Sequence, residues 1–185
     1  EGKEFDLRTK KTAAIALKDD DRVIAVEKQD ETAGTVIMVS KGGMSIRFAT
    51  DTVPVMGKGA GGVKCMKLDE GDRVIFAAQI ADEGEILTIS DRGYAKRSLV
   101  FDYEIQGRNG KGLKTFDLKN GSNGTAIAAV LYVKEPYDIV IRQFHGEETV
   151  VNTETVFIEQ RPGKGMLTVM ALLDDIVIGA KKIKS

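Results

Sequence analysis

The stretch S-D-R-G-Y-A-K-R-S-L-V-F-D-Y-E-I-Q-G-R-N-G-K-G-L-K-T-F, residues 90–116, holds two glycine-centred basic clusters. The first is R-G-Y-A-K-R at residues 92–97, and the second is R-N-G-K-G at residues 108–112. Glycine permits a positive φ and the close approach of another molecule, and lysine or arginine beside such turns can bind phosphates. The stretch therefore predicts turns and sheet edges that face a polyanion, and we expect its two clusters to share one surface.

The same pattern recurs along the chain. Three segments align with one another, at residues 34–68, 84–118 and 137–172. Gly62, Gly112 and Gly165 occupy equivalent positions, at spacings of 50 and 53 residues. In addition, residues 17–26 match residues 68–77, so the beginning of the chain corresponds to the back half of a further unit. We therefore interpret the chain as an array of repeats and as a piece of a longer protein.

Each unit contains four short segments suited to β-strands. In the second unit they are residues 85–90, 95–100, 113–118 and 126–133. They are rich in β-branched and apolar residues and are bounded by Gly, Asp, Asn or Pro. Residues 36–39 are continuously apolar, as in a strand that is covered on both faces.

A repeated unit of four strands and about fifty residues is typical of blades in a radial all-β array. We therefore predict an all-β, propeller-like array of four-stranded blades. The predicted blades are residues 34–83, 84–136 and 137–185, with part of a blade at residues 1–33. A β-sandwich with accidental self-similarity is the alternative.

The composition is that of an ordinary globular protein, with 42% hydrophobic and 30% charged residues. No run approaches the roughly 18 apolar residues of a membrane span, so we expect no membrane partner. The net charge of −1 conceals a segregation along the sequence. Residues 19–31 carry six acids and two bases, whereas residues 40–67 carry five bases and one acid. A fold can place these charges on opposite sides, although mixed solvated surfaces would need no such explanation.

The residues for enzyme chemistry are scarce. His145 is the only histidine and Cys65 the only cysteine, which leaves no evident nucleophile–base pair and excludes a multi-histidine metal site and an internal disulfide. The glycine-rich run at residues 57–62 lacks the G-x-x-x-x-G-K-[ST] spacing of a phosphate-binding loop. We therefore expect no catalytic residue, no metal and no cofactor in this chain.

If the units are blades, basic residues beside the glycines recur about every 50 residues and form a curved positive rim. Such a rim suits a bent DNA duplex that is bound through its phosphates with little reading of bases. The candidate DNA-binding residues are Lys41, Arg47, Lys58, Lys64, Arg92, Tyr94, Lys96, Arg97, Arg108, Lys111, Lys114, Arg161 and Lys164. The last unit has G-E-E-T-V at residues 146–150 where the middle unit has G-Y-A-K-R, so it should repel DNA at that point.

These motifs resemble those of a known family. G-Y-A-K-R-S at residues 93–98, followed by F-D-Y at residues 101–103, is similar to the G-Y-G-K-R-T…E-Y signature in C-terminal domains of bacterial type IIA topoisomerase A subunits. Q-G-R-N-G-K-G at residues 106–112 resembles the gyrase A box, Q-[RK]-R-G-G-[RK]-G, and departs from it at Gly107 and Asn109. A shorter box-like remnant, Q-R-P-G-K-G, lies at residues 160–165. The resemblance covers essentially the whole chain.

The resemblance implies a β-pinwheel, a propeller-like disc of blades that binds and bends double-stranded DNA. In the family, DNA cleavage belongs to a tyrosine in the N-terminal region of the A subunit, and ATP hydrolysis belongs to the B subunit. The implied parent is thus an ATP-dependent topoisomerase, while this chain lacks both catalytic parts. The implied partners of the full protein are a second A subunit and the ATPase B subunit, and the implied location is the cytoplasm, in association with the nucleoid.

The resemblance leaves two enzymes open. Gyrase uses its full box to wrap DNA and introduce negative supercoils, whereas topoisomerase IV, with a degenerate box or none, relaxes and decatenates DNA. The altered boxes here favour topoisomerase IV. Gyrase with an intact box further upstream is the alternative. A protein-interaction propeller is a more remote one, because the Trp-Asp punctuation of such repeats is missing.

Overall fold

The computed structural model describes residues 13–18, 20–119, 121–172 and 174–183. Its strands are β1 (Thr35–Ser40), β2 (Met44–Ala49), β3 (Val74–Ile80), β4 (Glu85–Ser90), β5 (Tyr94–Leu99), β6 (Leu113–Lys114), β7 (Ile127–Val133), β8 (Asp138–Gln143), β9 (Glu148–Asn152), β10 (Met166–Leu167) and β11 (Val177–Lys182). One 3-10 turn follows the second strand of each unit. These turns are η2 (Thr50–Thr52), η3 (Val100–Asp102) and η4 (Thr153–Thr155). None of the helical segments described is long and apolar enough to cross a membrane.

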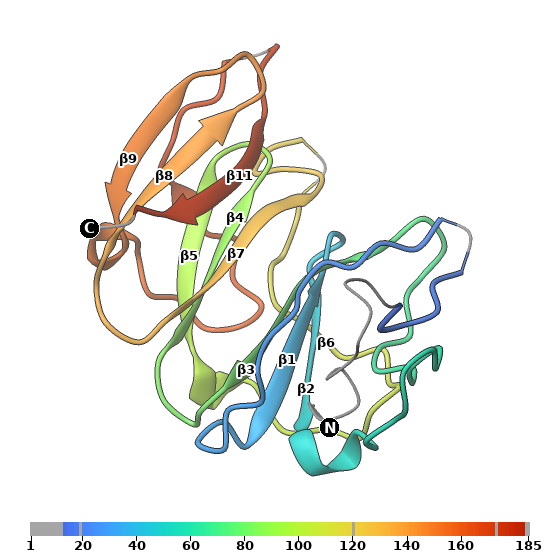
Figure 1. The fold of residues 1–185 in the computed structure, drawn as a ribbon. Coiled ribbons are helices and arrows are strands. Elements are labelled where there is room, and N and C mark those ends of the chain that lie inside the picture. The colour runs from blue at the N-terminus through green and yellow to red at the C-terminus, as the bar shows by residue number, and fades with distance from the viewer. Residues whose placement is uncertain (1–12, 19, 120, 173, 184–185) are drawn as a thin grey trace.

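The strands form three antiparallel sheets, which follow one another across the molecule (Figure 1). Their strand orders are β3-β1-β2-β6, β10-β5-β4-β7 and β11-β8-β9. The strand that closes each repeat, β3, β7 or β11, lies at one edge of its sheet, and β7 contacts both β3 and β11. The closing strands therefore meet side by side while the sheets fan outward from them. This arrangement confirms the predicted all-β, propeller-like array.

The outer strand of each four-stranded sheet comes from the following repeat unit. β6 belongs to the second unit but pairs with β2 of the first, with Leu113 opposite Ser45. In the same way, β10 of the third unit pairs with β5 of the second, with Met166 opposite Ala95. The blades thus exchange strands, a connection that the contiguous repeat boundaries do not show.

Glycine is required where an exchanged strand begins. Gly112 directly precedes β6 and has a φ of 75°, a conformation that side chains with a Cβ rarely adopt. A Cβ on Gly112 would lie 2.1 Å from the carbonyl oxygen of Ser45. Gly165, which precedes β10, has a φ of 71° and would place a Cβ 3.0 Å from the carbonyl oxygen of Ala95. Gly112 and Gly165 therefore mark points where neighbouring units approach each other closely.

The core lies between the sheets. In β4, Ile86 packs in a cluster with residues of the first sheet such as Ile37. Leu87 and Ile89 instead pack with residues of the third sheet such as Ile141. Alternate side chains of a strand point to opposite faces, so the middle sheet is covered on both sides. Each such fully buried side chain stabilises the fold by about 1.5–3 kcal/mol relative to exposure.

Residues 13–18 and 20–33 form no strand in the structure. Part of this segment runs along β3, where the backbone N–H of Asp30 donates to the side-chain carbonyl of Gln79 at 2.9 Å. The backbone N–H of Gln79 donates in turn to the carboxylate of Glu27 at 2.8 Å. The described part of the predicted partial blade therefore lies against the first sheet. Residues 1–12 lie outside the described residues.

Candidate nucleic-acid interface

Two equivalent contacts join consecutive units, and we call them the first and the second junction. In the first junction, residues 106–112 lie against residues 63–69, and Lys67 N–H donates to the Gly110 carbonyl at 2.8 Å. In the second, residues 159–165 lie against residues 114–119, and Asp117 N–H donates to the Gly163 carbonyl at 2.9 Å. The gyrase-box-like segment and its shorter remnant thus occupy the same structural position, one unit apart.

An arginine secures each junction in the same way. Arg108 donates from its guanidinium to the carbonyl of Lys64 at 3.2 Å, and Arg161 donates to the carbonyl of Lys114 at 3.0 Å. Arg161 also donates through Nε to the Asp102 carbonyl at 2.7 Å. Both arginines are half-buried. Each therefore places a positive charge against the backbone of a junction lysine.

Four of the predicted lysines project from the junctions and are exposed. They are Lys64 and Lys111 at the first junction and Lys114 and Lys164 at the second. Lys111 Nζ lies 2.7 Å from Asp69, and Lys114 Nζ lies 3.2 Å from Asp117. The Lys111 ammonium lowers the pKa of the Asp69 carboxyl. Exposed pairs of this kind contribute little stability, so a phosphate can replace the carboxylate.

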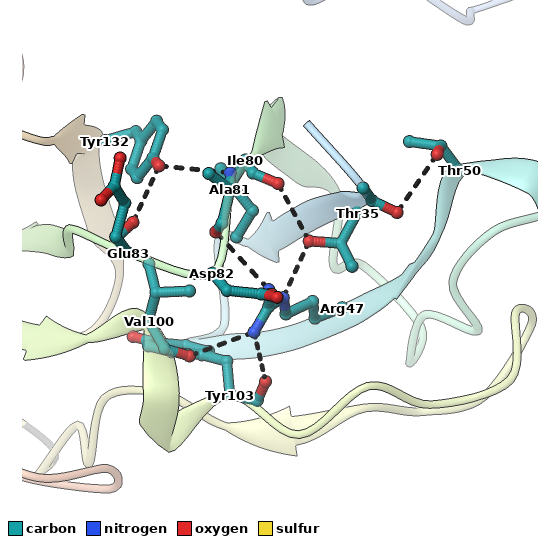
Figure 2. Close-up of polar contacts among 11 residues, drawn as sticks. Thr35, Arg47, Thr50, Ile80, Ala81, Asp82, Glu83, Val100, Tyr103 and Tyr132 are labelled. Carbon is teal, nitrogen blue, oxygen red and sulfur yellow. Dashed lines mark hydrogen bonds and ion pairs between the residues drawn. The ribbon is translucent and has the colours of Figure 1, made fainter. Parts of the chain in front are cut away.

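The structure corrects the prediction for Arg47. Its side chain is only 5% exposed and is enclosed by protein acceptors (Figure 2). Nε donates to Thr35 Oγ1 at 2.9 Å, and the other guanidinium nitrogens donate to main-chain carbonyls and to the Asp82 carboxylate. Two of these carbonyls belong to Val100 and Tyr103 of the next unit. Arg47 therefore clamps two units together and has no donor left for DNA.

Arg97 has the equivalent internal role, which corrects a second prediction. Its Nε donates to the Val156 carbonyl at 2.8 Å, and NH1 lies 2.6 Å from the Glu85 carboxylate. A further nitrogen donates to the Glu154 carbonyl at 3.0 Å. All its guanidinium nitrogens are thus used within the protein, and the second unit is clamped to η4 of the third.

Lys96 is also internal, against expectation. Its side chain is fully buried, and Nζ donates to Ser98 Oγ at 2.6 Å and to the Gln160 carbonyl at 3.2 Å. Burial lowers the pKa of Lys96 from 10.5 to about 8, although the carboxylate of Glu159 opposes this shift. Lys96 therefore supports the second junction from inside the protein.

Four other candidates lie away from the lysines of the junctions or make protein contacts. Arg92 is half-buried and donates to the Asp175 carbonyl at 3.1 Å, and Tyr94 packs against the core. Lys41 is exposed and shares a hollow with the acidic loop at residues 69–72. Lys58 is exposed on the turn at residues 57–60.

The two basic clusters of residues 90–116 face different neighbours. Residues 92–97 contact the third unit, whereas residues 108–112 contact the first. The expectation that they share one surface is therefore wrong. The junctions also include Lys67 and Lys119, which the sequence reasoning did not select. Lys67 closely follows Lys64, and Lys119 closely follows Lys114, the equivalent lysine of the next unit. This place in the repeat is the signal that would have found them.

The two acids of the G-E-E-T-V segment lie at the hairpin between β8 and β9. Glu148 lies at the start of β9, where it pairs with Arg142 across the strands, and Glu147 is exposed on the preceding turn. Repulsion of DNA at this hairpin remains a prediction.

Comparison with known proteins agrees with this geometry. The family model described as "DNA gyrase C-terminal domain, beta-propeller" matches residues 6–30, 34–81 and 84–130. The A subunit of DNA gyrase from Pseudomonas aeruginosa is 30% identical over 171 residues, which are 92% of this chain and 18% of that protein. The A subunit of DNA gyrase from Escherichia coli is 30% identical over 179 residues, 96% of this chain and 20% of that protein. The chain therefore spans about a fifth of these relatives.

Solved structures share the fold. The crystal structure of the C-terminal domain of DNA topoisomerase IV superposes with a TM-score of 0.84 at 22% identity, over 92% of this chain and 53% of that one. The DNA gyrase A C-terminal domain superposes with a TM-score of 0.78 at 24% identity, over 92% and 57%. With the family model, they confirm the β-pinwheel. The chain belongs to the family of DNA gyrase C-terminal β-propeller domains, the C-terminal domains of type IIA topoisomerase A subunits.

Proposed function

We propose that this chain binds and bends double-stranded DNA with little sequence preference, as the C-terminal domain of a type IIA topoisomerase A subunit. One observation carries the proposal. Equivalent exposed lysines recur at successive junctions, Lys64 with Lys111 and Lys114 with Lys164. At each junction an arginine donates to the equivalent backbone carbonyl. A fan of blades turns this recurrence into a curved row of positive charge. A duplex that follows the row must bend.

The chemistry of the row favours backbone binding over base reading. Lysine presents a compact charge on a flexible stem, whereas the planar fork of arginine gives directional recognition. The half-buried forks of Arg161 and Arg108 donate to protein carbonyls, Arg161 through two nitrogens and Arg108 through one. The exposed lysines are therefore the groups available to the duplex, and phosphate contacts carry no sequence information directly.

A salt titration of duplex binding tests the proposal. Neutralising phosphates releases counterions, so log affinity should fall with log salt with a slope of about −0.9 per phosphate contact. The double variant Lys114→Gln/Lys164→Gln should weaken binding to unrelated duplexes equally and reduce the slope by about 2. Lys181→Gln, on the exposed end of β11, is the matched control and should change the slope little. Salt-independent binding, or no binding to duplex DNA, would overturn the proposal.

We further propose topoisomerase IV as the parent enzyme, on the structure of the altered box. Asn109 has a φ of 64°, and asparagine adopts this region more readily than most residues, so this departure from glycine preserves the backbone. Gly107 instead removes a basic side chain, and a Cβ there would meet nothing within 4 Å. The box therefore keeps its shape and loses a charge, which weakens its hold on wrapped DNA.

The names of the relatives favour gyrase, so the two enzymes need a direct test. Relaxed nicked plasmid is sealed by ligase in the presence of the chain, and the linking number is measured. Topoisomerase IV predicts a small change, which should grow in Gly107→Arg. A large change of one sign with the unaltered chain would assign it to gyrase, and the same outcome would leave DNA binding intact.

The remaining parts of the proposal concern the full-length protein. We propose that it acts in the cytoplasm, on the nucleoid, as an A-subunit dimer with an ATPase B subunit, and that this chain contributes no catalysis. ATP-dependent strand passage should therefore require both full-length subunits, and this chain alone should not cleave DNA. Cleavage by the isolated chain would contradict this division of roles.

A further inference from the structure

A phenylalanine side chain is exposed to solvent beside the second junction. Phe101 in η3 is 86% exposed. The equivalent positions of η2 and η4 hold acids, Asp51 and Glu154. An exposed aromatic ring gives up the stabilisation of about 1.5–3 kcal/mol that burial would provide. A charged residue suits the turn equally well, so the fold alone does not explain the ring.

The ring lies next to one basic residue of the second junction, Arg161. Phe101 lines a hollow of about 290 Å³ together with Gln160 and Arg161 of the box-like remnant. The guanidinium of Arg161 links two carbonyls, that of Asp102 next to the ring and that of Lys114 in the junction. Phe101 and the backbone of Lys114 therefore flank the same side chain, which places the ring at the edge of the second junction.

The turn that carries Phe101 is held rigidly. Val100 is buried, and Arg47 donates to the carbonyls of Val100 and Tyr103, which lie before and after residue 101 in the chain (Figure 2). Tyr103 is buried as well, and its hydroxyl lies 2.6 Å from Thr115 Oγ1. Because the turn is firmly anchored, the Phe101 side chain is held in position for contact with a partner.

Electrostatics does not account for a contact at this point. Asp102 and Glu104 also line the hollow, and their carboxylates oppose phosphate binding there. A contact at Phe101 must therefore gain from burial of apolar surface. In duplex DNA, that surface is offered by stacked bases, and apolar side chains that enter between base steps kink the helix.

We propose that Phe101 is an apolar wedge that enters a base step of duplex DNA held by Lys114 and Lys164, and so concentrates the bend at the second junction. This inference rests on the proposed function. It adds a bending element to the row of lysines, with base stacks rather than phosphates as its binding partner.

The test compares Phe101→Ala with the unaltered chain on a short duplex labelled at its ends for energy transfer. We expect the variant to bind about tenfold more weakly, and to bend the saturated duplex less. It should also lose the preference of the unaltered chain for a duplex with one mismatched pair, where unstacking costs less. The salt slope should stay unchanged, because an apolar contact releases no counterions.

Two further variants are matched controls. Phe101→Trp keeps a large ring and should retain bending. Phe144→Ala removes another phenylalanine, 66% exposed at the hairpin after β8, and should leave affinity and bending unchanged. Thermal melts should show all three variants folded, because both rings are exposed.

The outcomes separate the two proposals. If the unaltered chain binds duplex DNA but Phe101→Ala binds and bends it equally well, the wedge is wrong, DNA binding stands, and the ring is left to a protein partner. A changed salt slope in Phe101→Ala would also overturn the wedge, because the residue would then act through phosphates. Failure of the unaltered chain to bind duplex DNA would overturn both proposals.

Discussion

The first and second junctions have equivalent backbone contacts but differ in chemistry at two repeat positions. In the first, Ile46 and Phe48 of β2 are buried against Met66. In the second, Lys96 and Ser98 of β5 occupy the equivalent places, and the lysine donates to the serine and to the box-like remnant. An apolar contact and a hydrogen-bonded amine thus fill equivalent sites. The repeat therefore requires that side chains fill this space, and it accepts either apolar or hydrogen-bonded polar side chains there.

This difference explains why a basic motif became part of the core. A buried amine is costly unless it is hydrogen-bonded, and both of the partners of Lys96 lie within 3.2 Å. The neighbouring Arg97 satisfies the carbonyls of Val156 and Glu154 in the next unit and the Glu85 carboxylate. The G-Y-A-K-R motif therefore holds adjacent blades together, and in the proposed function the lysines without such enclosure bind DNA.

The largest expected effect is the loss of Arg97. Arg97→Met should lower the free energy of unfolding by about 3–5 kcal/mol, because it leaves the Glu85 carboxylate partly buried without its partner. Arg47→Met is the matched variant and should cost about 1–3 kcal/mol, since the Asp82 side chain is 89% exposed and returns to water. Urea unfolding measures both values. Equal losses of unfolding free energy in the two variants would show that the different burial of Glu85 and Asp82 has no effect on stability.

Exchanging the chemistry of the junctions should have the next largest effect. Ile46→Lys places an amine among Phe48 and Met66 without the hydroxyl that serves Lys96, and should cost about 3 kcal/mol. Ile46→Met keeps the volume and apolar character and should cost less than about 1.5 kcal/mol. Denaturant midpoints compare the pair. If the lysine were tolerated as well as methionine, the proposed need for hydrogen-bond partners would be wrong.

The buried amine should also make stability depend on pH. Because the pKa of Lys96 is about 8 in the fold and 10.5 as its ordinary value, the unfolded chain binds more protons between these pH values. Stability should therefore rise with pH above 8, by about 2 kcal/mol from this group over the next two pH units. Lys96→Met should remove that rise. Thermal melts across the range, in which both proteins gained or lost stability in parallel, would contradict the assignment.

The smallest effect separates the exposed lysines by their partners. Within the residues that the structure describes, Lys164 Nζ has no carboxylate partner, whereas Lys111 pairs with Asp69. Lys164→Gln should therefore weaken DNA binding by about 1 kcal/mol, and Lys111→Gln by less. Asp69→Asn should strengthen binding at low salt and lose this advantage at high salt, because exposed charges are screened. An equal loss in both lysine variants would show that Asp69 does not compete with phosphate.

Much of the fold could be predicted from the residues themselves. The fifty-residue spacing of Gly62, Gly112 and Gly165 and the apolar run at residues 36–39 predicted blades with strands covered on both faces. The structure has both features. The exchange of outer strands could not be predicted, because the residues of β6 favour a strand equally well beside either neighbour. In the structure, the close approach of Gly112 to Ser45 and the backbone bonds from Thr115 and Phe116 to Gly43 hold β6 on the preceding sheet.

Less of the candidate site could be predicted, because charge alone does not show where a side chain points. Lys96 and Lys114 look equally basic in the printed sequence, yet one is fully buried and the other exposed. Alternation along β5 places residue 96 on the same face as Ser98, which lies opposite Ile86, and the box-like remnant then covers it. The carbonyl of Gln160, which accepts from Lys96, lies 64 positions further along the chain.

The class of fold, the spacing of the units and the family follow from the residues alone, because they depend on local periodicity and on glycines that few residues can replace. Tertiary structure decided which basic residues of 90–116 support the fold and which remain for a ligand. The physical reason is the packing of each unit against the next. This packing encloses Arg97 between Glu85 and carbonyls of the next unit, leaves Lys111 in solvent, and places Phe101 beside the second junction.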